Sequence, residues 1–197
     1  MGKLVVLMGK SASGKDTIYN ILKADESLKL QQLVPYTTRP KRDGEVEGVT
    51  YHFVTEEGFG RLSEAGRVIE HRAYETVYGL WRYFTAEDDA FDLENNSYLL
   101  IGTLEAYVSI VEHFGRDKVI PVMVTLDDGL RLQRALEREK EQTHPKYEEL
   151  CRRFLADSAD YTQEKMDAAG IVRIFENYSS EDTAAQISAY IKEQLLL

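Results

Sequence analysis

Cysteine is almost absent from this chain, because its 197 residues include only Cys151. No disulfide can form within the chain, so we expect a reducing compartment such as the cytoplasm. Long apolar runs are absent as well. None approaches the ~20 residues of a membrane-spanning helix, and the first residues lack the pattern of a signal peptide. We therefore expect a cytoplasmic protein without a membrane partner.

Positive charge is also scarce. The chain has 24 Lys and Arg against 34 Asp and Glu, a formal net charge of −10. Proteins that bind nucleic acid rely on broad positive fields, so this balance argues against a nucleic-acid partner. A site for a small anionic ligand would have to be locally basic. The apolar fraction of 43% is ordinary for a globular protein and sufficient for a core.

Short apolar runs alternate with helical patterns along most of the chain. Runs at 3–8, 97–101, 118–126 and 170–175 are typical of buried strands. Helical spacing follows the first run at 16–24. Alternation of this kind predicts an α/β fold with three layers, a parallel sheet with helices on both faces.

Two further helices carry start signals. Asp127 or Asp128 is a suitable N-cap for the helix that follows. Ser179 and Asp182 have the spacing of a capping box at the start of the last helix. The buried stripe of that helix is predicted to contain Ile187, Ile191 and Leu195.

Three segments interrupt the alternation. Residues 36–84 contain short runs with alternating faces and turn residues, which predict a small, partly antiparallel subdomain. Residues 139–149 are polar and indicate a mobile flap. The acidic run at 87–94 is interpreted as a solvated helix face. We expect one domain over 1–197, with a core at 1–35, 85–138 and 168–197, the subdomain at 36–84 and a helical lid at about 139–167.

The clearest motif is "GKSASGKDT", which we call the phosphate-binding loop (residues 9–17). Its glycines allow a tight turn that aims backbone N–H groups at phosphate oxygens, and the next helix adds its positive end. Its lysine supplies charge to the β and γ phosphates. The strand before and the helix after fit this reading, so we expect ATP to bind here. The residues expected to bind it are Gly9, Ser11, Ala12, Ser13, Gly14, Lys15, Asp16 and Thr17.

Asp16 stands where such loops carry Ser or Thr, whose hydroxyl ligates Mg²⁺. A carboxylate beside phosphates is unfavourable unless a cation lies between them. Carboxylates are also preferred Mg²⁺ ligands. We therefore hypothesise that Asp16 holds Mg²⁺, directly or through water. The alternative is that Asp16 only caps the helix and the nucleotide holds the metal.

A second basic group follows in "TTRPKRDGEVEGVTYHFV" (37–54). Arg39 and Arg42 could bind a phosphate through their guanidinium forks, and the hydroxyls of Tyr51 and Tyr78 could donate to the same phosphate. Taken alone, such a turn is also compatible with an ordinary solvated surface.

At this point the chain resembles the guanylate kinase family. The 37–54 segment is similar to that family's mononucleotide-binding segment, and "VIEHRAYETVYG" resembles the next one. "RALER" and "CRRF" resemble the arginine-bearing lid, and "IFENYSSEDTA" resembles the carboxy-terminal stretch. The resemblance covers nearly the whole chain, in order.

The resemblance implies ATP-dependent, Mg²⁺-dependent phosphorylation of a nucleoside monophosphate, most simply GMP. It implies that the acceptor monophosphate is bound by Arg39, Arg42, Tyr51 and Tyr78, and that Glu70 bonds the guanine edge. It further implies that charge on the transferring phosphoryl group is neutralised by Lys15, Arg134, Arg138 and Arg153. Asn177 would lie near the donor base.

The chain departs from the family at four positions. Leu80 and Pro35 stand where the family has serines that contact guanine. Ile101 and Thr103 stand where it has aspartates. Loss of polar partners from a base pocket reduces discrimination, so the identity of the acceptor stays open.

Two other functions remain possible. The ribose bisphosphate kinases also resemble this chain in "GKD" and in a strand ending Gly-Thr, so ribose 1,5-bisphosphate is an alternative acceptor. A non-catalytic guanylate-kinase-like binding module is the other alternative, although such a module would have no use for Gly14, Lys15 and the lid arginines. The sequence leaves open the oligomeric state and the preference for ATP over GTP.

Overall fold

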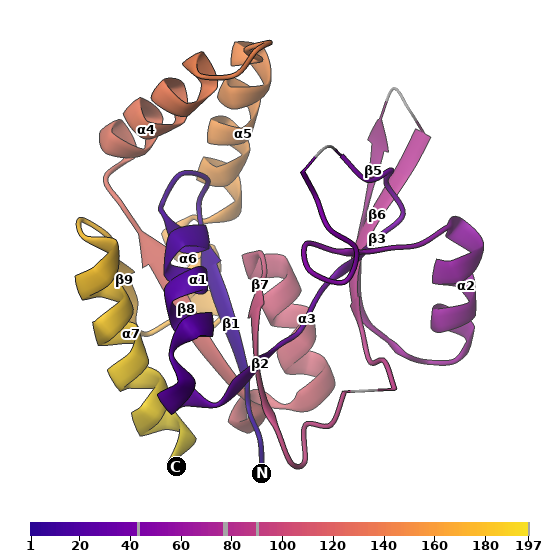
Figure 1. Ribbon diagram of the computed structural model, residues 1–197. Coiled ribbons are helices and arrows are strands. Elements are labelled where there is room, and N and C mark those ends of the chain that lie inside the picture. Colours follow the sequence, from indigo (N-terminus) through magenta and orange to yellow (C-terminus); the bar gives the residue numbers. More distant parts are fainter. Residues whose placement is uncertain (43, 77–78, 90, 197) are drawn as a thin grey trace.

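Two β-sheets of unequal size organise the chain, for which a computed structural model describes residues 1–42, 44–76, 79–89 and 91–196 (Figure 1). The larger sheet has five parallel strands in the order β2-β7-β1-β8-β9. These strands are β1 (Leu4–Gly9), β2 (Leu30–Gln32), β7 (Ser97–Ile101), β8 (Val119–Thr125) and β9 (Ile174–Glu176). The parallel sheet expected from the alternating pattern is thereby confirmed.

The central strand β1 is buried on both faces, which explains its unbroken apolar run. Side chains alternate across a strand, so Val6 and Met8 belong to one core cluster and Val5 and Leu7 to another. The helices α1 (Lys15–Ala24) and α7 (Ser180–Leu195) cover the second face, and α3 (Leu104–Phe114) and α6 (Gln163–Ala168) cover the first. The molecule therefore has the three layers that the sequence predicts.

The predicted helix starts are largely confirmed. The Asp127 side chain accepts from Leu130 N and caps α4 (Asp128–Lys140). Ser179 caps α7 by accepting from Asp182 N, one half of a capping box. In that helix Ile187 and Ile191 are fully buried. The other helices are α2 (Glu56–Glu64), α5 (Tyr147–Asp160) and the short 3-10 turns η1 (Glu26–Leu28) and η2 (Arg116–Lys118).

The smaller sheet has four strands in the order β4-β3-β6-β5. Its pairing is mixed, because β5 and β6 are antiparallel whereas β3 and β4 are parallel. Tyr36 and Phe84 form its small apolar core. The strands are β3 (Tyr36–Thr37), β4 (His52–Phe53), β5 (Val68–Thr76) and β6 (Gly79–Ala86). This is the partly antiparallel unit expected between residues 36 and 84.

Three local expectations need correction. The helix expected for the acidic run at 87–94 is wrong, since its described residues form turns and irregular structure. Asp92 explains this, because its carboxylate accepts from the N–H groups of Glu94 and Asn95 and so favours a turn. The last strand covers 174–176 rather than 170–175. The segment 139–149 is not irregular throughout, because it includes the end of α4 (to 140) and the start of α5 (from 147), and only 141–146 form the connection between them.

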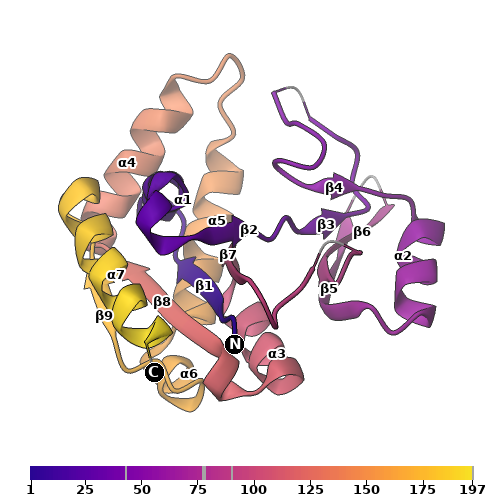
Figure 2. The same ribbon diagram turned by 60° about the horizontal axis from the view of Figure 1, so that its bottom comes forward.

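The phosphate-binding loop joins β1 to α1 at the carboxyl edge of the large sheet. Figures 1 and 2 show the α4–α5 hairpin on one side of this loop and the small sheet on the other. Ligands of open parallel sheets bind at this edge, beyond the strand ends. Within the described residues, no helix has the length and apolar character needed to cross a bilayer.

Candidate nucleotide site

The phosphate-binding loop is closely packed against the core beneath it. Gly14 has a φ of 86°, a left-handed conformation that glycine adopts without strain. A Cβ atom at Gly14 would lie 2.2 Å from Nδ2 of Asn177. Asn177 is fully buried and donates from that nitrogen to the Ser13 carbonyl at 2.8 Å. Asn177 thus holds the loop from below, whereas its expected contact with the donor base stays a prediction.

A buried ion pair holds the outer part of the loop. The Arg131 guanidinium donates to the Ser11 carbonyl at 2.8 Å, and the Asp157 carboxylate accepts from Ser11 N at 2.8 Å. Arg131 Nη1 also lies 3.4 Å from Asp157 Oδ2, and the guanidinium lies over the Phe154 ring. The Ser11 residue is therefore clamped through both its N–H and its C=O by α4 and α5.

Lys15 and Asp16 begin the helix that follows the loop. Their charged atoms lie 3.4 Å apart, and the Asp16 side chain is 74% exposed. A solvent-facing carboxylate beside the lysine is a hard oxygen donor of the kind that Mg²⁺ prefers, so Asp16 fits a magnesium ligand. Among the residues that the structure describes, no group of three or more His, Cys, Asp or Glu side chains could hold a metal.

The predicted arginines of α4 and α5 lie beside the loop. Arg134 Nη1 lies 3.8 Å from the position of a Cβ on Gly14. Arg138 and Arg153 line a small cavity of about 100 Å³ to which Ser11 of the loop also contributes. Arg153 pairs with Glu149 at 2.8 Å. The structure thus brings Arg134, Arg138 and Arg153 to the side of the loop that faces the α4–α5 hairpin.

Arg39 is the buried cation of the small sheet, with a side chain only 3% exposed. Both of its terminal nitrogens bond the Glu45 carboxylate, and this pairing holds the pKa of Glu45 below its ordinary value. Glu45, and to a lesser extent Tyr83, raises the pKa of Arg39 above its ordinary value. A carboxylate occupies the position that a bidentate phosphate would take, so the guanidinium is oriented for an anion.

The neighbouring residues of Arg39 match the expected acceptor site in part. Its guanidinium carbon lies 5.3 Å from the centre of the Tyr51 ring, and burial raises the pKa of that phenol. Arg42 is exposed, and its backbone N–H donates to Glu45 at 2.8 Å. Tyr78 lies outside the described residues, so its expected role stays a prediction.

Glu70 is a buried carboxylate with two oriented partners. Its side chain is 2% exposed; Oε1 accepts from the Thr85 hydroxyl at 2.8 Å and Oε2 from Arg72 Nε at 3.2 Å. Arg72 Nη1 also donates to the Thr103 hydroxyl at 3.2 Å. Arg72 therefore connects the small sheet to the start of α3, where Thr103 is the N-cap.

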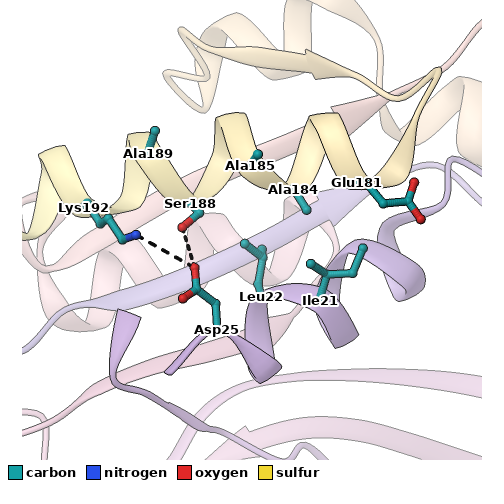
Figure 3. Close-up of a pocket in the computed structure, with 9 residues that line it drawn as sticks. All are labelled: Ile21, Leu22, Asp25, Glu181, Ala184, Ala185, Ser188, Ala189 and Lys192. Atoms are coloured by element: carbon teal, nitrogen blue, oxygen red, sulfur yellow. Dashed lines mark hydrogen bonds and ion pairs between the residues drawn. The ribbon is translucent and has the colours of Figure 1, made fainter. Parts of the chain in front are cut away.

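Among the larger cavities elsewhere on the described surface, two concern the small sheet and the last helix. One of about 570 Å³ is bordered by Tyr74 of β5 and by Thr103 together with residues of α3, α5 and α6, between the small sheet and the core. The other, of about 510 Å³, lies between α1 and α7 (Figure 3). Its polar side chains pair with one another, since Asp25 accepts from Ser188 at 2.7 Å and lies 4.0 Å from Lys192. We interpret this second cavity as a packing seam.

The structure defines an α/β protein with a small inserted sheet and a glycine- and lysine-containing loop after β1, and comparison with known proteins specifies its relatives. Residues 1–83 match the family model described as guanylate kinase. Guanylate kinase of Wolbachia pipientis wMel is 41% identical over 88 residues, which cover 44% of this chain and 43% of that protein. Guanylate kinase of Symbiobacterium thermophilum is 44% identical over 87 residues, which cover 44% of this chain and 41% of that protein.

The whole chain aligns with a solved structure. The crystal structure of guanylate kinase from Anaplasma phagocytophilum covers 100% of this chain and 87% of its own, with a TM-score of 0.67 and 23% identity. At this identity the likeness concerns the fold. Over its first 83 residues the chain is therefore similar in sequence to guanylate kinases, and over its whole length it resembles a guanylate kinase in fold. The sequence match spans less than half the length of the curated relatives, 43% and 41%.

Several residues of the site were not predicted from the sequence. Arg131 and Asp157 form the clamp on Ser11, and Glu45 holds Arg39. Glu45 lies six residues after Arg39, within the basic segment, so its pairing could have been suggested by that spacing. The pairing of Arg131 with Asp157 joins residues 26 positions apart, and nothing local in the sequence indicates it.

Proposed function

We propose that this protein transfers the γ-phosphoryl group of Mg·ATP to a nucleoside monophosphate, and that GMP is the acceptor, yielding GDP and ADP. The observation that carries the proposal is the surroundings of the phosphate-binding loop. Arg134 lies beside Gly14, and Arg138 and Arg153 line a cavity together with Ser11. An overall acidic chain thus concentrates cations around one loop, which suits a polyphosphate.

The donor site would be the phosphate-binding loop itself. Its backbone N–H groups and the start of α1 would bind the phosphates, and Lys15 would supply charge to the β and γ groups. The set we propose for ATP comprises Gly9, Ser11, Ala12, Ser13, Gly14, Lys15, Asp16, Thr17 and Asn177. We propose that Asn177 contributes by holding the Ser13 carbonyl.

The acceptor site would be the anion pocket of the small sheet. Arg39, Arg42 and Tyr51 would bind the monophosphate, with Tyr78 as a further predicted donor. The Glu45 carboxylate accepts hydrogen bonds from the Arg39 guanidinium. An incoming phosphate would therefore share the guanidinium with Glu45 or displace the Glu45 carboxylate. Glu70 would accept hydrogen bonds from the guanine edge, because its buried oxygens have lone pairs left beyond those used by Thr85 and Arg72.

The chemistry needs positioning and positive charge more than covalent participation. The acceptor phosphate is already ionised, so no general base is required. Lys15, Arg134, Arg138 and Arg153 would neutralise the charge that accumulates on the transferring phosphoryl group. Mg²⁺ bound with the nucleotide would neutralise further phosphate charge, and Asp16 would hold it. Lid residues 139–167 would close over the donor and exclude water.

A different phosphorylated acceptor is the second candidate. The observation that favours it is a shortage of polar partners for a base. Leu80 and Pro35 are apolar, and Ile101 and Thr103 at the end of β7 replace the carboxylates that the resemblance leads us to expect. Ribose 1,5-bisphosphate is the acceptor to test. We propose the cytoplasm as the compartment.

The experiment is an acceptor panel with Mg·ATP, followed by separation of nucleotides on an anion-exchange column. GMP, AMP, CMP, UMP and ribose 1,5-bisphosphate are each supplied as acceptor, and GTP replaces ATP in a parallel series. The proposal expects GDP and ADP to form in equal amounts from GMP and ATP. Turnover of ribose 1,5-bisphosphate without turnover of GMP would support the second candidate. Lys15→Met serves as the matched control, because it removes the loop charge and should abolish transfer.

A further inference from the structure

We propose that Arg72 is a specificity-determining residue that donates hydrogen bonds to the O6 edge of guanine in the acceptor. This inference rests on the proposed function and names the group that reads the acceptor base. It concerns a residue beside Glu70 that the sequence did not single out. Its basis is the Glu70–Arg72 pair, together with the contacts that fix the orientation of both side chains.

Arg72 is placed on the same face of β5 as Glu70. Side chains two apart in a strand share a face, and Arg72 Nε lies 3.2 Å from Glu70 Oε2. The Arg72 side chain is only 16% exposed and donates from Nη1 to the Thr103 hydroxyl at 3.2 Å. An arginine fixed at both nitrogens loses little further freedom on binding, so it is preorganised for a ligand.

The pair also lies close to the acceptor anion pocket. Arg72 of β5 is paired with Tyr83 of β6, and the Tyr83 ring centre lies 5.9 Å from that of Tyr51. Tyr51 in turn lies beside the Arg39 guanidinium. Thr103, the second partner of Arg72, borders the cavity of about 570 Å³ between the small sheet and the core. Arg72 therefore lies between the phosphate pocket and this cavity.

The charges of the pair distinguish between two kinds of acceptor group. A second phosphate placed against Arg72 would also face the buried Glu70 carboxylate and would be repelled by it. A neutral group with donors next to an acceptor suits the pair better. Guanine has that arrangement, because its N1–H and 2-amino group can donate to a carboxylate while O6 accepts from a guanidinium. Arginine is the side chain most often found on the O6 edge of guanine in nucleic-acid complexes.

This role would replace contacts that the chain lacks. Leu80 and Pro35 provide no hydroxyl to the base, and Thr103 provides no carboxylate. The structure bonds the Thr103 hydroxyl to Arg72 instead. The Arg72 guanidinium, held by the Glu70 carboxylate and the Thr103 hydroxyl, would supply a donor for O6 that Leu80 and Pro35 cannot supply.

The test uses acceptors that differ from GMP at one position. 6-Thio-GMP keeps the N1–H and 2-amino donors but replaces O6 with sulfur, a weak acceptor. IMP keeps O6 and lacks the 2-amino group. Steady-state KM and kcat are measured for GMP, 6-thio-GMP and IMP with the parent, with Arg72→Met and with Lys23→Met. Lys23 is an exposed lysine of α1 and serves as the matched control for loss of one positive charge.

We expect Arg72→Met to raise KM for GMP about tenfold to a hundredfold, the discrimination of a good arginine contact to a base, with kcat changed much less. The preference for GMP over 6-thio-GMP should disappear, whereas the preference for GMP over IMP should be kept. Lys23→Met should match the parent in all three ratios. Circular dichroism and a thermal melt establish that each variant is folded. Arg72→Lys, which keeps the charge and loses the fork, should recover only part of the loss.

Three distinct results would overturn the inference. If the parent turns over GMP and Arg72→Met keeps both the KM and the 6-thio-GMP preference, Arg72 does not read the base although the proposed function stands. If the parent neither binds nor phosphorylates GMP but accepts ribose 1,5-bisphosphate, the proposed function fails, and the guanine contact fails with it. A variant that is folded but loses both analogue preferences equally would assign Arg72 a structural role only.

Discussion

The Arg131 guanidinium donates a 2.8 Å hydrogen bond to the carbonyl of Ser11, so a residue of α4 fixes the backbone of the phosphate-binding loop. Arg131 is 1% exposed, and its charge is balanced by Asp128 and by Asp157. Asp157 also accepts from Ser11 N. The loop conformation therefore depends on an ion pair that links two helices.

Arg131→Met should lower the free energy of unfolding by about 3 kcal/mol, the lower end for a broken buried pair, because the Asp157 carboxylate, 16% exposed, loses its cation while Asp128 is 54% exposed. Urea denaturation measures it. Gln133→Met, on the same helix but exposed, should change stability by about 0.5 kcal/mol or less. The double variant Arg131→Met with Asp157→Asn should lose less stability than the sum of the losses measured for the two single variants. A loss near 0.5 kcal/mol for Arg131→Met would contradict the clamp.

Ala12 lies within the loop with a φ of 60°, a left-handed conformation that costs a residue with a side chain roughly 1–2 kcal/mol. Ala12→Gly should relieve this strain, while the greater freedom of glycine in the unfolded chain offsets part of the gain. We expect a net stabilisation of about 0.5–1 kcal/mol by urea denaturation. Ala185→Gly, at an exposed position of α7, should have the opposite sign. Destabilisation by both glycines would show that Ala12 is not strained.

Asp16→Asn separates the two hypotheses for this carboxylate. Without Mg²⁺ the variant should bind ATP more tightly than the parent, because a negative charge beside the phosphates has been removed. With Mg²⁺ it should bind more weakly, because a ligand of the metal has been lost. Isothermal titration calorimetry with and without Mg²⁺ measures both. An equal effect of Mg²⁺ on parent and variant would leave Asp16 only as an acidic residue in the first turn of α1, where Gly14 and not Asp16 is the N-cap.

Glu149 links stability to pH. The hydrogen bonds from Arg152 and Arg153 lower its pKa from 4.5 to about 2. A carboxyl group whose pKa is lower in the folded protein than in the unfolded chain stabilises the folded state fully when the pH is above the unfolded pKa. For Glu149 this contribution is lost as the pH falls from about 4.5 toward 2. Because the Glu149 side chain is 38% exposed, solvent screening keeps the effect small, about 0.5 kcal/mol. The stability difference between parent and Glu149→Gln should therefore shrink between pH 6 and pH 3 in urea titrations. A difference that stays constant over this range would contradict the pairing.

Local patterns predicted the features that depend on neighbours in sequence. The strand–loop–helix order around Lys15, the N-cap Asp127 and the apolar face of α7 all follow from short-range spacing, and the structure confirms them. The same local reasoning failed at 87–94. There, side-chain bonds from Asp92 to the following backbone favour a turn over a helix.

The site was harder to predict because its important pairs are distant or unexpected. Arg131 lies in a highly charged helix, where a solvated position is the ordinary expectation, yet it is buried against Ser11 and Asp157. Arg39 was expected to be an open phosphate ligand, and the structure pairs it with Glu45. Arg72 gave no signal in sequence, since its contact with Thr103 depends on how the small sheet meets the core.

The most direct measurement is ³¹P NMR of the purified protein with ATP, GMP and Mg²⁺. The account predicts that the γ-phosphate signal of ATP decreases while the two phosphate signals of GDP grow, and that Lys15→Met abolishes this change. An unchanged spectrum, or growth of inorganic phosphate alone in the presence of GMP, would contradict the assignment of GMP as the phosphoryl acceptor.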